Sequence, residues 1–104
     1  MNWIAEREFQ LEASDGVTTV KLLLGAPYRV ADVREWRCAF HITGLPDPID
    51  QWAAGEDGLQ ALQLALVMAR ICLDYAPLPP GTHLTWLGEP TLGLPSADAA
   101  AAGP

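Results

Sequence analysis

The sequence contains two histidines, His41 and His83, and two cysteines, Cys38 and Cys72, whose side chains could take part in acid–base or nucleophilic chemistry. A histidine titrates near neutral pH and can act as a general acid or base, and a cysteine activated by a histidine can act as a nucleophile. Cys38 and His41 fall in one segment that alternates between apolar and polar residues. Because they have opposite parity in that strand, their side chains leave opposite faces of the sheet and do not form a nucleophile–base pair.

Both cysteines are expected to be buried and unreactive. Cys38 alternates with Trp36 and Phe40, as an inward-facing strand residue does. Cys72 follows Met68 by one turn of a predicted helix. A thiol in apolar surroundings keeps its proton and is a poor nucleophile.

The two histidines are expected on strands, on the side that faces away from the helix. Catalysis needs a partner within hydrogen-bond reach, and the pattern places none beside either histidine. We therefore expect no enzyme. The alternative is an enzyme, or a subunit that completes an enzyme's site, using His41 or His83, because histidine is the residue type best suited to general acid–base catalysis at neutral pH.

No metal site and no cofactor site is expected. The acidic residues Asp47, Asp50, Glu56 and Asp57 lie close together in the sequence, but their spacing does not follow a calcium-binding loop. The glycine pair in Gly55–Gly58 precedes a helix, as in some phosphate sites. Glu56 and Asp57 lie between the glycines and would repel an anion, so Asp57 is better explained as a helix cap.

A long helix follows Asp57. The carboxylate of Asp57 and Gln60 at the third helical position resemble a capping box, and the helix is predicted to run to about Tyr75 before Pro77 ends it. Its polar side is a narrow stripe formed by Gln60, Gln63, Val67, Arg70 and Asp74. Most of the remaining circumference is apolar, so the helix must be covered on more than one side, either by loops or by a second subunit.

Three strands are expected before this helix and one after it, at Ile4–Glu12, Val17–Leu24, Glu35–Thr43 and Thr82–Leu87. In the first strand Arg7 is the one charged residue on the otherwise apolar side. Asp15-Gly16 supplies the turn to the second strand. The segments Tyr28–Arg34 and Ile49–Glu56 are expected to be connectors.

These elements predict an α+β fold, a small antiparallel sheet of about four strands in β-β-β-α-β order with the helix on one face. The other face of the sheet is expected to meet water. We expect a single domain over residues 1–95 and a disordered alanine-rich tail over residues 96–104.

Two segments resemble a family of small bacterial domains of unknown function. The strand Trp36–Gly44 has the pattern W-x-C-x-aromatic-x-I-x-G, and the helix start within Gly55–Leu66 has the pattern G-x-D-x-x-Q-A-L. Leu84–Trp86 and Gly93–Pro95 extend the resemblance to roughly residues 4–95. The resemblance implies a bacterial, intracellular α+β domain and no particular activity.

The charge of the chain narrows the class of partner. Six basic residues against thirteen acidic ones give a net charge of −7. This field repels nucleic-acid phosphates and anionic lipids, so neither a nucleic acid nor a membrane is expected to bind, whereas a basic protein is attracted. The start of the sequence lacks the pattern of a signal peptide and the cysteines form no CxxC motif, so a cytoplasmic location is expected.

We therefore expect a non-catalytic protein-binding domain, such as a bacterial toxin-immunity or antitoxin-type protein that recognises a basic partner. The expected contact residues are Glu6, Glu8, Glu12, Asp47, Asp50, Trp52 and Glu56. Trp52 is expected in the loop before the helix, packed on the helix N-terminus or exposed to a partner. The alternative is a homo-oligomeric adaptor or secretion chaperone, a homodimer formed through the apolar helix or a sheet edge.

Overall fold

Two long antiparallel strands begin the fold. The computed structural model describes residues 2–97, in which β1 (Trp3–Ala13) and β2 (Gly16–Gly25) pair from the turn at Ser14 and Asp15 to their far ends. The hairpin predicted from Asp15-Gly16 is therefore confirmed. Alternation buries one side of the hairpin, at Phe9, Leu11, Val20, Leu22 and Leu24.

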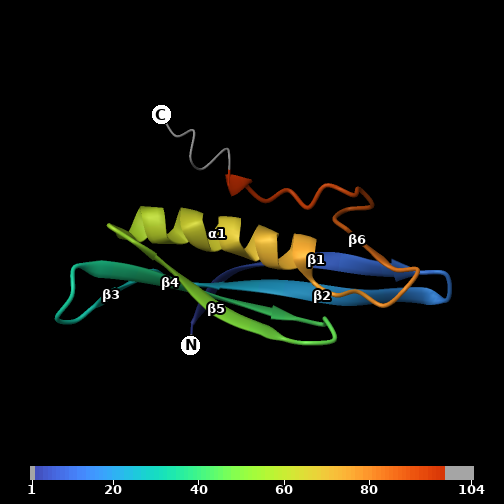
Figure 1. Cartoon of the computed structure of the whole chain (residues 1–104), viewed down its shortest axis with the longest axis horizontal. Helices are drawn as coiled ribbons and strands as arrows, with labels where there is room; N and C mark the ends of the chain where they lie inside the picture. Colours follow the sequence, from blue (N-terminus) through green and yellow to red (C-terminus); the bar gives the residue numbers. More distant parts are fainter. Residues whose placement is uncertain (1, 98–104) are drawn as a thin grey trace.

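Four more strands and one helix complete the described chain: β3 (Tyr28–Val30), β4 (Glu35–Thr43), β5 (Ile49–Gly55), α1 (Gly58–Tyr75) and β6 (His83–Thr85). All six strands form one antiparallel sheet, in which β6, β1, β2 and β4 are successive neighbours (Figure 1). β2 and β3 pair with different parts of one edge of β4, and β5 pairs with its other edge.

The α+β class is confirmed, but the sheet has six strands rather than about four. The two segments expected to be connectors contain β3 and β5, so five strands precede the helix. The sequence of β5, Ile-Asp-Gln-Trp-Ala-Ala-Gly, contains several residues that are uncommon in strands. It forms a strand because all seven residues pair with β4, an interaction that local propensity does not include.

The helix packs on β4 and β5 through small side chains. Ala61, Ala65 and Ala69 follow one another at four-residue spacing and are fully buried in the core. The backbone approach is so close that a Cβ atom at Gly55 would lie 2.5 Å from the amide nitrogen of Ala61. Asp57 caps the helix as predicted, because its Oδ1 accepts a hydrogen bond from the amide of Gln60 at 2.8 Å.

A C-terminal arm, residues 86–96, covers a second side of the helix. Leu94 in this arm is only 8% exposed and belongs to the hydrophobic core, and Trp86 and Leu92 pack against that core. Figure 1 shows the arm running alongside the helix, on the side away from the sheet. The arm therefore provides the second covering that the apolar helix requires, and no other subunit is needed on the side away from the sheet.

The polar stripe predicted for the helix is wrong at one position. Val67 is only 6% exposed. It lies between Leu66, which lines a pocket with Leu94, and Arg70, whose Nη1 donates a hydrogen bond to the Leu94 carbonyl oxygen at 2.9 Å. The arm therefore passes over this part of the stripe, which explains the burial.

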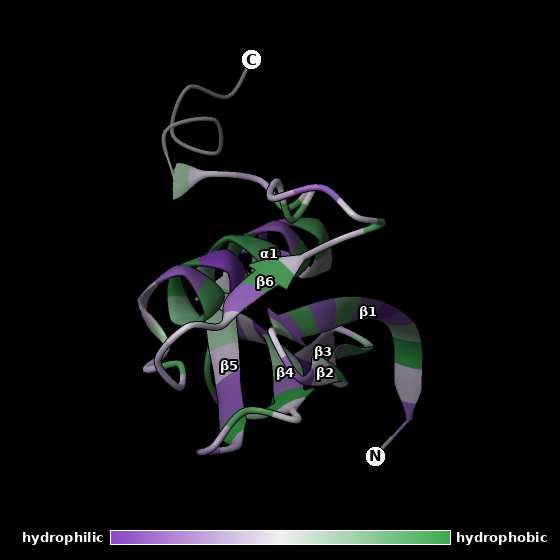
Figure 2. Cartoon of the chain, turned by 90° about the vertical axis from the view of Figure 1, so that its right-hand side faces the viewer, coloured by the Kyte–Doolittle hydropathy of each residue, from purple (hydrophilic) through white to green (hydrophobic). Residues whose placement is uncertain are grey.

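The sheet has a closed face and an open face. The closed face is covered by the helix and the arm, and its fully buried side chains are Phe9, Val20, Cys38, Phe40 and Ile42. The open face is the opposite side, onto which the intervening residues of each strand project. Within residues 2–97, neither the helix nor the arm covers the open face (Figure 1, Figure 2).

Candidate functional site

Register places two tryptophans on one row of the open face. Trp3 of β1 pairs with Gly25 of β2, and Trp52 of β5 pairs with Ala39 of β4. Gly25 and Ala39 are neighbours, because β2 and β4 pair at the adjacent position. The two indoles therefore stand on the two sides of a pair of small residues, with Cα atoms roughly 14 Å apart across three strand spacings.

These indoles belong to an aromatic patch, which we define as Trp3, Tyr28, Arg37, His41 and Trp52. The ring centroids of Trp3 and His41 are 5.9 Å apart, and the Arg37 guanidinium lies 3.9 Å from the centroid of the Trp52 ring. Tyr28 pairs with Arg37 across β3 and β4. The three large aromatic side chains remain 38% (Trp3), 44% (Tyr28) and 45% (Trp52) exposed. The patch is thus an organised but accessible apolar surface.

Carboxylates border this patch. Glu6 and Glu8 on β1 share a single cation, Lys21, whose Nζ lies 3.5 Å and 3.8 Å from their oxygens. Asp50 lies 3.8 Å from Nδ1 of His41. Glu12 lies away from the patch, at the hairpin end of β1, where it accepts a hydrogen bond from the Thr85 hydroxyl. One lysine faces two glutamates, so the β1 side of the open face keeps a negative charge.

Five of the seven residues predicted to contact a partner lie on the open face: Glu6, Glu8, Glu12, Asp50 and Trp52. Glu12 is apart from the other four, at the hairpin end of β1. The other two are elsewhere. Asp47 lies in the loop between β4 and β5, and Glu56 follows β5, where its amide donates to Oε1 of Gln60 at 2.6 Å. The single acidic segment predicted from the sequence is therefore divided.

The position predicted for Trp52 is wrong. This residue lies within β5 rather than in a loop, and its side chain is on the open face, so it does not pack on the helix N-terminus. The cause is the unrecognised strand, since alternation along β5 sends Ala53 to the core and Trp52 to the other side.

The contact surface expected from the sequence did not include Trp3, Tyr28, Arg37 and His41. The outward parity of Arg37 and His41 along β4 was a usable signal. The neighbourhood of Trp3 and Trp52 was not visible, because it depends on which strands pair and in which register.

The open face holds a histidine–carboxylate pair but no cysteine. The separation of 3.8 Å between His41 and Asp50 is longer than a hydrogen bond. Cys38 lies on the closed face, where its Sγ donates to the Gly25 carbonyl oxygen at 3.3 Å. Burial raises the pKa of the Cys38 thiol and also that of Cys72, so both thiols keep their protons at neutral pH.

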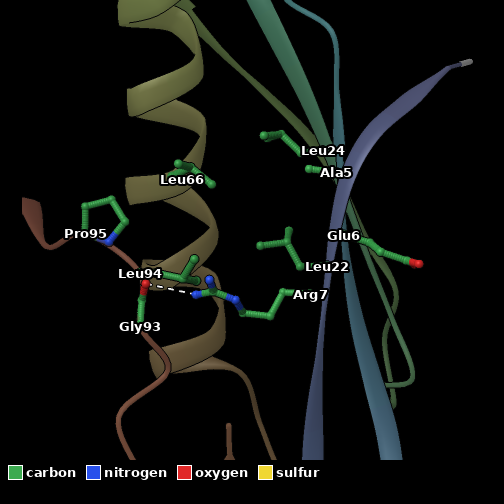
Figure 3. A pocket seen from close by; sticks show the side chains of 9 residues that line it. All are labelled: Ala5, Glu6, Arg7, Leu22, Leu24, Leu66, Gly93, Leu94 and Pro95. Atoms are coloured by element: carbon green, nitrogen blue, oxygen red, sulfur yellow. Dashed lines mark hydrogen bonds between the residues drawn. The ribbon is translucent and has the colours of Figure 1, made fainter. Parts of the chain in front are cut away.

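A small pocket opens between β1, the helix and the arm (Figure 3). Its volume is about 160 Å³, and it is lined by Ala5, Glu6, Arg7, Leu22, Leu24, Leu66, Gly93, Leu94 and Pro95. Arg7, the misfit of the first strand, borders it. The Arg7 guanidinium lies 3.8 Å from the Trp86 ring centroid and donates to the carbonyl oxygens of Leu92 and Gly93. Arg7 thus fixes the arm, and the pocket remains beside it.

Within residues 2–97, no three histidine, cysteine, aspartate or glutamate side chains come close enough together to hold a metal ion. The helix described there is not long and apolar enough to cross a membrane.

Residues 5–96 match the model of one protein family, described as a domain of unknown function (DUF6968). This match agrees with the expected relation to a family of unknown function. No curated protein and no solved structure matched the chain.

Proposed function

The chain belongs to the family of domains of unknown function DUF6968, and we propose that it is a non-catalytic domain that binds a basic protein through the open face of its sheet. The observation that carries this proposal is the aromatic patch. Trp3, Tyr28 and Trp52 expose large apolar surfaces on one face, although the same chain covers the other face of its sheet.

The composition of the patch fits a protein interface. Tryptophan, tyrosine and arginine are the residues most enriched among those that dominate binding energy. Arg37 lies over Trp52, and His41 lies against Trp3, so two of the aromatic side chains have a neighbour that restricts them. A side chain that is already positioned loses less conformational entropy when a partner covers it.

The charge around the patch selects the partner. The chain carries a net charge of −7, and Glu6, Glu8 and Asp50 border the aromatic residues on the open face. A basic partner is steered toward such a surface, and its association is faster at low ionic strength. Small size and acidity suit a bacterial toxin-immunity or antitoxin-type protein that acts in the cytoplasm, and this is the role that we propose.

The test is affinity capture from the lysate and the secreted fraction of the source organism, at low and at high salt, with identification by mass spectrometry. We expect one basic protein in stoichiometric amount that high salt releases. Glu6→Lys/Glu8→Lys should abolish capture at low salt. The matched control is Asp15→Lys/Glu89→Lys, which makes the same change in net charge (two changes of +2, from −7 to −3) at exposed sites outside the open face.

A second pair of variants tests the aromatic contribution. Trp52→Ala leaves the net charge unchanged and should weaken capture at low salt, whereas Leu59→Ala, at an exposed helix position, should not. Two results contradict the proposal: no basic protein is retained by the wild-type chain, or both lysine double variants lose capture equally. Equal loss would mean that only net charge matters and that the open face has no special part.

The homo-oligomeric alternative has lost part of its support. It was motivated by the apolar circumference of the helix, and the arm now covers one side of that helix. Leu59 and Ile71 stay exposed on it, at 67% and 44%. Sedimentation of the isolated chain distinguishes the two functions, since a stable dimer without any partner would favour the oligomer.

A further inference from the structure

The outer edge of β1 is paired along only part of its length. β6 pairs with Gln10, Leu11 and Glu12, but β1 continues from there back to Trp3. Within residues 2–97, no strand pairs with the outer edge of Trp3–Phe9 (Figure 2). This half of β1 has β2 on one side and an open edge on the other.

β6 ends because the chain reverses direction. Trp86 and Glu89 exchange two backbone hydrogen bonds, of 2.8 Å and 2.9 Å, around a tight turn. The central residues of that turn, Leu87 and Gly88, have φ angles of 53° and 82°. The turn directs the arm over the helix instead of along β1. Pairing between β6 and β1 therefore ends at Gln10.

The unpaired peptide groups can be identified from the hairpin. The tight turn makes Ala13 and Gly16 a hydrogen-bonded pair, and the register is regular from Ala5 to Ala13. Odd-numbered residues of β1 therefore point their N–H and C=O groups toward β2, and even-numbered residues point theirs outward. The outward N–H and C=O groups of Gln10 and Glu12 face β6. Those of Glu6 and Glu8 face the open edge. Such an edge is a template for an added strand.

The pocket lies on the closed-face side of this same edge. Ala5, Glu6 and Arg7 line it from β1, and Leu66 and Leu94 line it from the helix and the arm (Figure 3). An added strand would place alternate side chains on the two faces of the sheet. A residue opposite Ala5 or Arg7 would point to the pocket, whose volume of about 160 Å³ suits one aliphatic side chain.

Charge decides what the edge accepts. A residue opposite Glu6 or Glu8 would stand next to that glutamate on the open face. A second copy of the chain pairing through this edge would bring glutamates against glutamates, which is destabilising. Lysine or arginine at the same positions would be attracted, because Lys21 is the one cation that the two glutamates share.

We infer that the edge of β1 at Glu6 and Glu8 binds an extended segment of a protein partner as an added strand, in which an apolar residue directed at the pocket is flanked by lysine or arginine on both sides. This inference rests on the proposed function, of which it specifies the chemistry of the partner segment. The strand supplies the backbone hydrogen bonds, the pocket selects an apolar side chain, and the glutamates select its neighbours.

The probe is a capped, fluorescently labelled peptide of alternating lysine and valine. A peptide of the same composition with lysines and valines in separate blocks is the control for pattern, and alternating glutamate and valine is the control for charge. Fluorescence anisotropy should give tight binding for the alternating lysine–valine peptide alone. Amide hydrogen exchange should slow at Glu6 and Glu8 when this peptide binds, while Arg7 and Phe9, already paired with β2, should change little.

Two variants separate the contributions of charge and backbone. Glu6→Gln/Glu8→Gln should lower peptide affinity about five- to tenfold at low salt and little at high salt. Glu6→Pro removes an amide that points outward, a position where an edge strand tolerates proline, and should lower affinity more than tenfold at any salt concentration. Ala5→Leu should fill the pocket and weaken binding without removing a hydrogen bond.

Equal binding of the alternating and blocked peptides, or unchanged exchange at Glu6 and Glu8, would overturn the inference. Neither result depends on a variant that must fold. The inference and the proposed function can fail separately. If a basic protein is captured and Glu6→Pro captures it as well as wild type, the proposed function stands and the inference fails, because the open face binds the partner and the edge does not. If the peptide binds at the edge but no basic protein is captured, the edge can accept an added strand and the proposed function fails.

Discussion

Neighbouring residues on β4 show how differently the two faces of one sheet are organised. Phe40 is fully buried on the closed face among residues of β2, the helix and the arm. His41, the next residue, lies on the open face between Trp3 and Asp50. Side chains on the closed face are held by burial. On the open face, Arg37 is held by its stacking on Trp52 and by a hydrogen bond from its Nε to Oε2 of Glu35 at 2.6 Å. Stability and binding are therefore expected to reside in different residues of the same strands.

The largest effect should come from breaking the closed face. Phe40→Ala removes a side chain with no exposed surface and should lower the free energy of unfolding by about 3–5 kcal/mol. Trp52→Ala, which removes a larger side chain that is 45% exposed, should cost about 1 kcal/mol. Urea unfolding followed by circular dichroism measures both. Similar losses would mean that the aromatic patch is part of the structural core.

The arm gives the next largest effect, because it completes the closed face from beyond the helix. Leu94→Ala should destabilise the fold by about 2–3 kcal/mol, as expected for truncation of a buried leucine. Leu87→Ala is the matched control in the same arm, since Leu87 is 78% exposed and its loss should change stability by less than about 0.5 kcal/mol. If both substitutions had no effect, the arm would not be part of the folded core.

A smaller effect is expected at the helix cap. Asp57→Ala removes the acceptor for the Gln60 amide and should cost about 1 kcal/mol, while Asp57→Asn, which keeps a cap oxygen, should cost less. Thermal unfolding of the three proteins gives the comparison. Because the cap stabilises the element that covers the closed face, binding at the open face should be unchanged in both variants. Weaker binding in Asp57→Ala would show that the two faces are coupled.

The sequence predicted those parts of the fold in which pattern and local chemistry agree. The range of β4 and the end of the helix at Tyr75 are as predicted, and the Asp57 cap is confirmed. β5 was missed because its stability comes from pairing with β4, which no local pattern encodes. The tail expected over residues 96–104 lies almost wholly outside the described residues.

The candidate site was predictable only where it follows one strand. The alternation of Glu6, Glu8 and Glu12 identified an acidic ladder that the structure places on the open face. The aromatic patch requires five strands in register, because its residues lie on β1, β3, β4 and β5 and β2 joins β1 to β4. The open edge of β1 depends on where β6 stops. Both are properties of strand pairing between segments far apart in the sequence, which alternation within one segment does not determine.

The smallest effect, and the one that separates stability from binding most sharply, should come from Lys21. Its side chain is 37% exposed and lies between Glu6 and Glu8, so solvent screens both ion pairs. Lys21→Gln should destabilise the fold by at most about 0.5 kcal/mol at low salt, and high salt should remove the difference. The same substitution leaves two glutamates without a cation and should increase the affinity of the alternating lysine–valine peptide about twofold or more at low salt. Parallel urea unfolding and anisotropy titrations measure the two effects. A loss of peptide affinity would mean that Lys21 positions the glutamates for binding rather than competing with the partner for them.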